Sequence, residues 1–416
     1  MKLFLFIYLF TVLGGALRKW VISSKEIGNF ILFLQILIPY VLILVKGGLA
    51  NWRIGKSAFS IFILVLIVGI LNPLNLTINH GILGFLLHGS FFFVLFFYFN
   101  NRKLFDFKKI LPFLVIASLI HLLLVFYQYT QPSDSFINTY ADVEAVGSIA
   151  IVGNSARVTG TFSYISGFTG FLFFHSLLVW SLFKFRYKSI YSLLLLIMGL
   201  VACFMSGARA ATYLYLIVVV TIIFNEYYSV RKIIFDFKLF LPILIFATIL
   251  LGLGSEKFLD LILNSFTGFV ERRALGRSSG EENARIFGDF LEILNFRGNY
   301  PLLGVGLGST YQGAIRLFGT SPYILEYGFF ESEIIRILLE GGFILLIVRV
   351  FLTVFLINQT YIPKSGKFIL IVILIFFFPV VFNVYNAIFA ALGIILVDHF
   401  YYKESISIAF NYKSSK

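Results

Sequence analysis

The stretch GILGFLLHGSFFFVLFFYF, residues 81–99, decides the fold class of this chain. It contains one histidine and no aspartate, glutamate, lysine or arginine, and it is long enough to cross the hydrocarbon core of a bilayer as an α-helix. The rest of the chain has the same character: 59% of the 416 residues are hydrophobic, 13% are charged, and the mean hydropathy is +0.95. This composition excludes a soluble protein and indicates a polytopic membrane protein.

Similar apolar runs lie on both sides of this stretch. Because each run has the length of a membrane-spanning helix, the sequence predicts an all-α bundle of about twelve spans, at residues 3–17, 27–46, 57–74, 81–99, 110–130, 164–183, 189–206, 208–224, 239–256, 330–357, 368–384 and 386–402. The first run resembles a signal peptide, but no clear cleavage site follows it, and we interpret it as the first transmembrane helix. The single cysteine, Cys203, excludes a disulfide framework and a cysteine-based metal site.

Two polar segments interrupt the apolar pattern of what we interpret as one membrane domain, residues 1–416. The smaller loop covers 131–163 and the larger one 257–329. In the larger loop, ARIFGDFLEILNF (284–296) places its apolar residues on one stripe, which predicts an amphipathic helix on the membrane face. The glycine-rich turn PLLGVGLGST (301–310) follows no βαβ pattern, which argues against a nucleotide site. Its glycines are expected to let the backbone approach a headgroup or a sugar closely.

The distribution of lysine and arginine predicts the orientation. If the N-terminus is cytoplasmic, every cytoplasmic connection is short and basic, and the residues responsible are Lys46, Arg53, Lys56, Arg102, Lys103, Lys108, Lys109, Lys184, Arg186, Lys188, Arg231, Lys232, Lys238, Lys364, Lys367, Lys403, Lys413 and Lys416. Both termini then lie in the cytoplasm, and the two polar loops lie on the opposite side. That side carries about ten arginines and only about three lysines, which is not the pattern that orientation requires.

Arginine differs from lysine in having a planar guanidinium that can hold two oxygens of a phosphate at once. Three arginines near the outer ends of spans are therefore candidates to bind an anionic ligand. They are Arg157 before the sixth span, Arg209 between the seventh and eighth, and Arg285 in the amphipathic segment. The alternative is contact with anionic lipid headgroups. Arg336 in the tenth span joins these candidates, although its spacing from Glu340 also allows a structural i,i+4 ion pair.

The order of these elements carries a resemblance to a known family. RVTGTF precedes a span, SGAR joins two spans, and a long outer loop contains RIFGDF and PLLGVGLG before a helix that ends in EGG. From Asn154 to Phe343 this pattern resembles the O-antigen polymerase and O-antigen ligase superfamily of bacterial membrane enzymes. Ligases of that superfamily carry a histidine where the loop enters the span, whereas this chain reads ESEIIRILLEGG (331–342). The departure favours a repeat-unit polymerase over a ligase.

The resemblance implies a fold, a reaction and a location. The fold is similar to that of the lipid-dependent (GT-C) glycosyltransferases. The reaction transfers an oligosaccharide from undecaprenyl diphosphate to a sugar hydroxyl, at the periplasmic face of the bacterial inner membrane, in the biosynthesis of lipopolysaccharide O-antigen, capsule or exopolysaccharide. It needs no metal, cofactor or nucleotide sugar. The implied partners are the lipid-linked donor and acceptor, membrane lipids, a chain-length regulator and a flippase, with no nucleic acid. Arg157, Arg209 and Arg285 would address the diphosphate.

Glycosyl transfer also needs a group that removes the proton of the incoming hydroxyl. A partly buried carboxylate at the entrance of the tenth span suits this role. We expect Glu333 to act as the base, with Glu331, one step nearer solvent, as the alternative, and Arg285 completes the predicted catalytic set. Aromatic and polar side chains suit the faces and hydroxyls of a sugar, and those expected to recognise the acceptor are Tyr140, Asn154 and Tyr311.

A different class of function stays open. A lipid-linked oligosaccharide flippase or another secondary transporter would also use many spans and a cationic cavity, but it predicts charges and interrupted helices at the bilayer midplane. A structural scaffold would explain the hydrophobicity and leave the arginines unexplained. The histidines are expected to pack within or beside the spans, without a catalytic role, and they are His80, His88, His121, His175 and His399.

Overall fold

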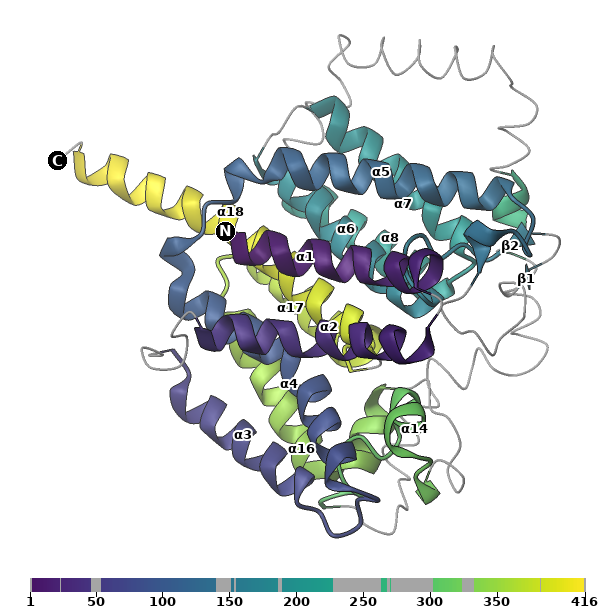
Figure 1. Ribbon diagram of the computed structural model, residues 1–416. Helices are drawn as coiled ribbons and strands as arrows, with labels where there is room; N and C mark the ends of the chain where they lie inside the picture. Colours follow the sequence, from purple (N-terminus) through teal and green to yellow (C-terminus); the bar gives the residue numbers. More distant parts are fainter. Residues whose placement is uncertain are drawn as a thin grey trace.

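The protein is a helical bundle (Figure 1). The computed structural model describes residues 2–22, 24–45, 54–139, 151–152, 155–185, 189–226, 263–267, 270, 302–323, 333–381 and 383–414. Apart from the short antiparallel pair β1 (Ile151–Val152) and β2 (Ser155–Ala156), the regular elements of this part are helices. Seven of them are long and apolar enough to cross a membrane. The prediction of a helical membrane protein is thus confirmed in its coarse form.

The helices follow the predicted runs closely. They are α1 (Lys2–Ala16), the π-helical turn η1 (Leu17–Val21), α2 (Lys25–Val45), α3 (Lys56–Ile70), α4 (Ile78–Asn101), the 3-10 turns η2 (Arg102–Leu104) and η3 (Phe107–Lys109), α5 (Leu111–Thr130), the 3-10 turn η4 (Phe136–Asn138), α6 (Ile165–Phe185), α7 (Ser189–Ser206), α8 (Arg209–Asn225), α14 (Gln312–Phe318), α16 (Glu333–Asn358), α17 (Lys364–Val372), the π-helical turn η6 (Ile373–Phe377) and α18 (Val384–Ser414).

The count of spans differs from the predicted twelve. The seven long apolar segments are Lys2–Val21, Glu26–Val45, Ile78–Leu104, Leu111–Thr130, Ile165–Phe185, Glu333–Asn358 and Tyr385–Ser407. Three shorter apolar helices, Lys56–Ile70, Tyr191–Ser206 and Arg209–Asn225, occupy three further predicted runs. The run predicted at 368–384 becomes α17 and η6, and its helical part ends at Phe377. The run predicted at 239–256 lies outside the described residues.

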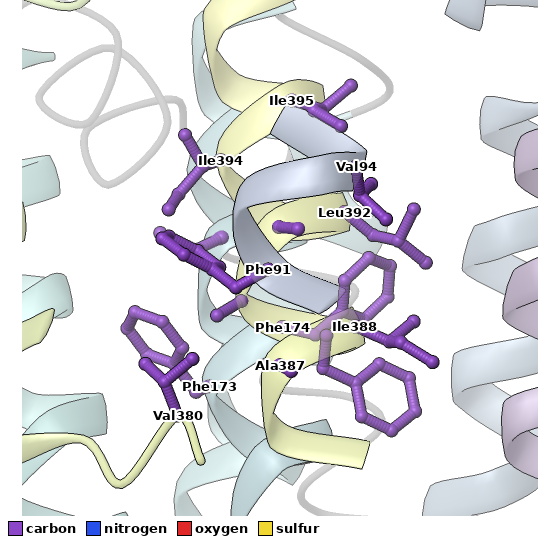
Figure 2. Packing of buried hydrophobic residues seen from close by; sticks show 14 of the residues in the cluster. Phe91, Val94, Phe173, Phe174, Val380, Ala387, Ile388, Leu392, Ile394 and Ile395 are labelled. Atoms are coloured by element: carbon purple, nitrogen blue, oxygen red, sulfur yellow. The ribbon is translucent and has the colours of Figure 1, made fainter. Parts of the chain in front are cut away.

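The core forms where α18 packs along α6 and α4. Figure 2 shows Phe91 and Val94 of α4, Phe173 and Phe174 of α6, and Ile388, Leu392 and Ile395 of α18 meeting there. Peripheral helices instead expose large apolar side chains outward, such as Ile116, Ile120 and Leu123 on α5. Their spacing of three and four residues places them on one helix face. An apolar face of this kind suits contact with lipid.

The bundle has two different ends. Figure 1 shows both termini at one end, on the left, and β1, β2 and α14 at the other, on the right. We call the first the terminal end. It includes an ion pair between Arg102 and Asp398, 3.1 Å apart. We call the second the loop end, and its described segments include 17–22, 71–77, 151–152, 155–164, 206–209 and 302–323.

Helix α16 is not the straight span that the sequence predicts over 330–357. Two helical segments join at Gly342, whose φ of 64° lies in the left-handed region that favours glycine. On a straight helix Glu333 and Arg349, 16 positions apart, would be separated by about 24 Å. In the structure Glu333 Oε1 lies only 3.4 Å from Arg349 Nη2. The break at Gly342 therefore turns the two helical segments toward each other.

The glycine-rich turn supplies hydrogen-bond partners for the backbone groups that this break leaves without helical partners. In an unbroken helix the carbonyls of Leu339 and Glu340 would accept the N–H groups four residues later. Here they accept the N–H groups of Val305 (2.7 Å) and Gly306 (3.1 Å), while Ile344 N–H donates to the Leu302 carbonyl (3.3 Å). Broken helices are tolerated in membranes only where such groups find partners. The turn 302–306 therefore stabilises the interruption of α16.

Candidate functional site

One predicted arginine, Arg157, contacts the turn that precedes another, Arg209, at the loop end. Arg157, between β2 and α6, donates from Nε to the carbonyl of Ser206 (3.3 Å) at the end of α7. Ser206 Oγ in turn accepts the N–H of Ala208 (3.1 Å), directly before Arg209, the first residue of α8. RVTGTF and SGAR, which are far apart in the sequence, are thus neighbours in the structure.

A buried glutamine holds the RVTGTF segment in place. Gln128 of α5 donates to the carbonyl of Gly160 (3.0 Å) and accepts the N–H of the same residue (2.8 Å). Gly160 has a φ of 59°, and a Cβ there would lie 2.3 Å from Nε2 of His121. The glycine is therefore required for both its backbone conformation and its close approach to α5. Sequence reasoning missed Gln128, because a glutamine at the end of an apolar run has no distinctive pattern.

The end of the first span adds two cations that the sequence analysis did not single out. Arg18 Nη1 donates to Ser163 Oγ (3.1 Å), and Lys19 Nζ donates to Thr159 Oγ1 (3.0 Å) and to the Gly160 carbonyl (3.1 Å). Both side chains are 8% exposed. The available signal was their position, since two consecutive cations directly follow the first apolar run.

Arg336 and Arg18 both lie close enough to Tyr311 to act on it electrostatically. Arg336 is 2% exposed and Tyr311 is buried. Burial raises the pKa of the Tyr311 hydroxyl, and the charges of Arg336 and Arg18 act in the opposite direction, which places both cations near the phenol. Because burial is the largest of these effects, Tyr311 is neutral at physiological pH and can donate a hydrogen bond. The structure thus brings a predicted diphosphate ligand and a predicted acceptor ligand to one place.

Glu333, the predicted base, contacts two other segments of the described part of the bundle. Its Oε1 faces Arg349 Nη2, and its Oε2 accepts the N–H of Val381 (2.6 Å). Val381 belongs to the segment 378–381 after η6, where the backbone leaves the helical conformation. Glu333 therefore accepts a hydrogen bond from a backbone N–H at a second place where the helices of the bundle are interrupted. A carboxylate has further lone pairs, so these contacts leave it capacity to accept a proton.

Glu340 does not form the i,i+4 ion pair with Arg336 that its spacing allows. Its Oε2 accepts hydrogen bonds from His88 Nε2 (2.9 Å) and Gly308 N–H (2.9 Å). Its Oε1 accepts them from the hydroxyl (2.6 Å) and the N–H (3.2 Å) of Thr310. Glu340 instead clamps the glycine-rich turn onto α4 and α16. The helical spacing was a poor guide, because donors from distant segments occupy both oxygens.

The prediction that the turn's glycines approach a ligand is corrected at three positions. A Cβ at Gly304 would lie 2.4 Å from the Leu339 carbonyl oxygen, one at Gly306 2.2 Å from Asn75 Oδ1, and one at Gly308 2.1 Å from the His80 carbonyl oxygen. These glycines let the turn pack against the protein itself. Their positive φ angles add a second reason for glycine.

Buried contacts also account for His80, His88 and His175. His80 contacts Thr77 Oγ1 (2.9 Å) and the Gly319 carbonyl (3.1 Å), and His175 contacts Tyr215. His88 does more than pack, because Arg349 Nη1 lies 3.3 Å from its Nδ1 while its Nε2 faces Glu340. Arginine can only donate, so Nδ1 is the acceptor and Nε2 carries the proton. Neutral His88 thereby links Arg349 to Glu340.

Several predicted site residues lie outside the described residues: Tyr140, Asn154, Arg285 and Glu331, together with the amphipathic segment 284–296. In the part of the chain that the structure describes, no group of three or more histidine, cysteine, aspartate or glutamate side chains could hold a metal ion. None of the family models, curated proteins or solved structures compared with this chain matches it.

Proposed function

We propose that this protein is a lipid-linked glycan polymerase that transfers an oligosaccharide from undecaprenyl diphosphate to a sugar hydroxyl of an acceptor repeat unit. One observation carries the proposal: cations from separate segments gather at the loop end of a membrane-spanning bundle. Arg157 contacts the turn before Arg209, while Arg336 and Arg18 both act on Tyr311. Ionisable groups in a membrane bundle are costly and mark functional sites, and guanidinium groups suit a diphosphate.

The reaction forms one bond and breaks another. The acceptor oxygen bonds to the anomeric carbon of the donor sugar, the bond from that carbon to the diphosphate breaks, and its electron pair leaves with the diphosphate. Arg157, Arg209 and Arg336, with Arg285 of the larger loop, would neutralise the departing charge. Tyr311 would donate to a sugar oxygen, alongside Tyr140 and Asn154.

The base of this reaction is proposed to be Glu333, with Glu331 as the alternative. The observed contacts of Glu333 also support a structural role, since it joins Arg349 to the turn at Val381. The two roles make different predictions for Glu333→Gln. Loss of a base lowers the rate and leaves folding intact, whereas loss of a structural carboxylate lowers stability first.

We further propose about twelve spans in a bacterial inner membrane, both termini in the cytoplasm, and the loops 131–163 and 257–329 in the periplasm. The described cations at the terminal end, which support this orientation, are Lys56, Arg102, Lys103, Lys108, Lys109, Lys184, Lys364, Lys367 and Lys403. Cysteine labelling tests this orientation. The single native cysteine, Cys203, is fully buried and should not react with the reagent. In whole cells an impermeant maleimide should react with a cysteine at Ser279 and spare one at Ser365; the opposite pattern contradicts the orientation.

The activity itself is tested with purified protein in nanodiscs and a synthetic undecaprenyl-diphosphate-linked repeat unit. A ladder of longer oligosaccharides on a gel, with release of undecaprenyl diphosphate, is expected. Lipid A should not serve as an acceptor in place of the repeat unit, which separates a polymerase from a ligase. Donor that stays unextended with both acceptors contradicts the proposal.

A lipid-linked oligosaccharide flippase is the second candidate, because one observation favours it. Helices are interrupted inside the bundle at Gly342 and at residues 378–381, as in many transporters. In proteoliposomes a flippase would move a fluorescent lipid-linked oligosaccharide between leaflets without forming a glycosidic bond. The same preparation can be assayed for both movement and chain extension, so one experiment separates the two functions.

A further inference from the structure

Two buried cations at the end of the first span have only neutral partners. Within the residues that the structure describes, Arg18 and Lys19 contact the hydroxyls of Ser163 and Thr159 and the carbonyl of Gly160, and neither lies within ion-pair distance of a carboxylate. Arg18 Nε is buried and has no hydrogen-bond partner there. Burying a charge with neutral partners alone is costly. An anion bound between these side chains would remove that cost.

The local backbone presents both cations to the same segment. Consecutive side chains of an α-helix diverge by about 100°. Residues 17–21 instead form a π-helical turn, closed by the N–H of Ile22 and the carbonyl of Leu17 (2.9 Å). Arg18 and Lys19 both reach residues 159–163 from it. Turns of this kind occur frequently at functional sites.

This pair belongs to the cluster already described. Arg18 and Arg336 both act on the Tyr311 hydroxyl, and residues 159–163 directly follow Arg157. An anion held by Arg18 would therefore lie beside the other cations of the loop end. A guanidinium next to an ammonium offers several donors to tetrahedral oxygens, which suits a phosphate better than a single carboxylate.

We propose that Arg18 and Lys19 form a binding site for the phosphate of an anionic lipid. In a polymerase that phosphate belongs to the diphosphate of the carrier lipid, so this assignment rests on the proposed function. A phospholipid headgroup is the other source of the same chemistry. The pair would hold the diphosphate from the end of α1, whereas Arg157, Arg209 and Arg336 belong to later segments of the chain.

The test uses the full-length protein in detergent and measures binding of inorganic diphosphate by calorimetry, with undecaprenyl diphosphate and phosphatidylglycerol as lipid probes in native mass spectrometry. Arg18→Gln and Lys19→Gln should each weaken diphosphate binding about tenfold or more, because each removes a charged contact. Ser163→Ala removes a protein contact of Arg18 and keeps its charge, and Lys109→Gln removes an exposed cation of the terminal end. Both controls should stay within about twofold of the wild type.

Two results overturn the site: diphosphate binding that Arg18→Gln and Lys19→Gln leave unchanged, or an equal loss in Ser163→Ala, which would mean that Arg18 only shapes the loop. If Arg18→Gln does not fold, the diphosphate affinities of Lys19→Gln and Arg18→Lys are compared with that of the wild type instead. Loss of phosphatidylglycerol alone in the variants would assign the site to phospholipid and refute the carrier. Loss of diphosphate binding in a protein that never extends the donor would keep the site and reject the polymerase.

Discussion

Glu340→Gln tests the clamp on which the loop end depends. In the wild type the carboxylate accepts four hydrogen bonds, two at each oxygen. In its better orientation the amide oxygen of glutamine replaces Oε2 and keeps the contacts with Gly308 N–H and His88 Nε2–H. The amide nitrogen then replaces Oε1, where it can donate to the Thr310 hydroxyl but cannot accept from Thr310 N–H.

The expected loss follows from the one contact that this orientation does not restore, the hydrogen bond from Thr310 N–H. A hydrogen bond to a charged group contributes about 1.5–3 kcal/mol, so the substitution should lower the free energy of unfolding by roughly that amount. The reverse orientation costs more, because the amide nitrogen would face Gly308 N–H and His88 Nε2–H. His88 cannot relieve that conflict by moving its proton, since Arg349 donates toward its Nδ1, and Gly308 packs against the carbonyl of His80.

The assay can use the chain's own reporter. Cys203 is fully buried and is the single cysteine, so a thiol-reactive dye becomes fluorescent only when the bundle opens. Glu340→Gln should melt several degrees below the wild type. The matched control, Glu404→Gln, removes a carboxylate that is 52% exposed and pairs with Lys184, and it should change stability by less than about 1 kcal/mol. Equal melting temperatures for Glu340→Gln and the wild type would refute the clamp.

Three further predictions concern the backbone and the chemistry. Gly342→Ala places a Cβ 2.3 Å from the backbone of Leu302 at a φ of 64°, so this variant should melt well below the wild type. The control Gly28→Ala, whose Cβ would have nothing within 4 Å, should melt like the wild type. Equal melting temperatures for the two variants would contradict the break in α16. Glu333→Gln should lower the initial rate of donor extension by roughly 10²–10⁴ while diphosphate binding is retained; an unchanged rate removes it as the base. Arg157→Lys keeps the charge without the planar fork, and it should slow extension by about 30-fold or more in the same assay; full activity would show that charge alone suffices.

The sequence predicted the elements of the loop end better than their contacts. Glu340 and Arg336 are one helical turn apart, which suggested an ion pair, yet Glu340 bonds to His88, 252 positions away. The glycines of 301–310 suggested a ligand, but in the structure Gly304 fits against α16, Gly308 against α4, and Gly306 against Asn75, just before α4. In both cases the local pattern was correct, but the partner came from another segment.

The break in α16 could not be predicted from hydropathy. The run 330–357 has the mean hydropathy of one long span. A mean hydropathy does not show where the helix axis changes direction. The pair Gly341–Gly342 was visible, but whether a glycine continues or ends a helix depends on partners for the freed carbonyls. Val305 and Gly306 provide those partners here.

The sequence by itself determined that this chain forms apolar helices that can cross a membrane, and approximately where most of them begin and end. Each such helix satisfies its own backbone hydrogen bonds and depends on the hydrophobicity of its own residues, so the information is local. Only the tertiary structure decided which ionisable groups meet. Lys19 reaches Thr159 across 140 positions, and Glu340 reaches His88 through the packing of α16 on α4. Such contacts depend on how the helices pack, and no local pattern contains that information.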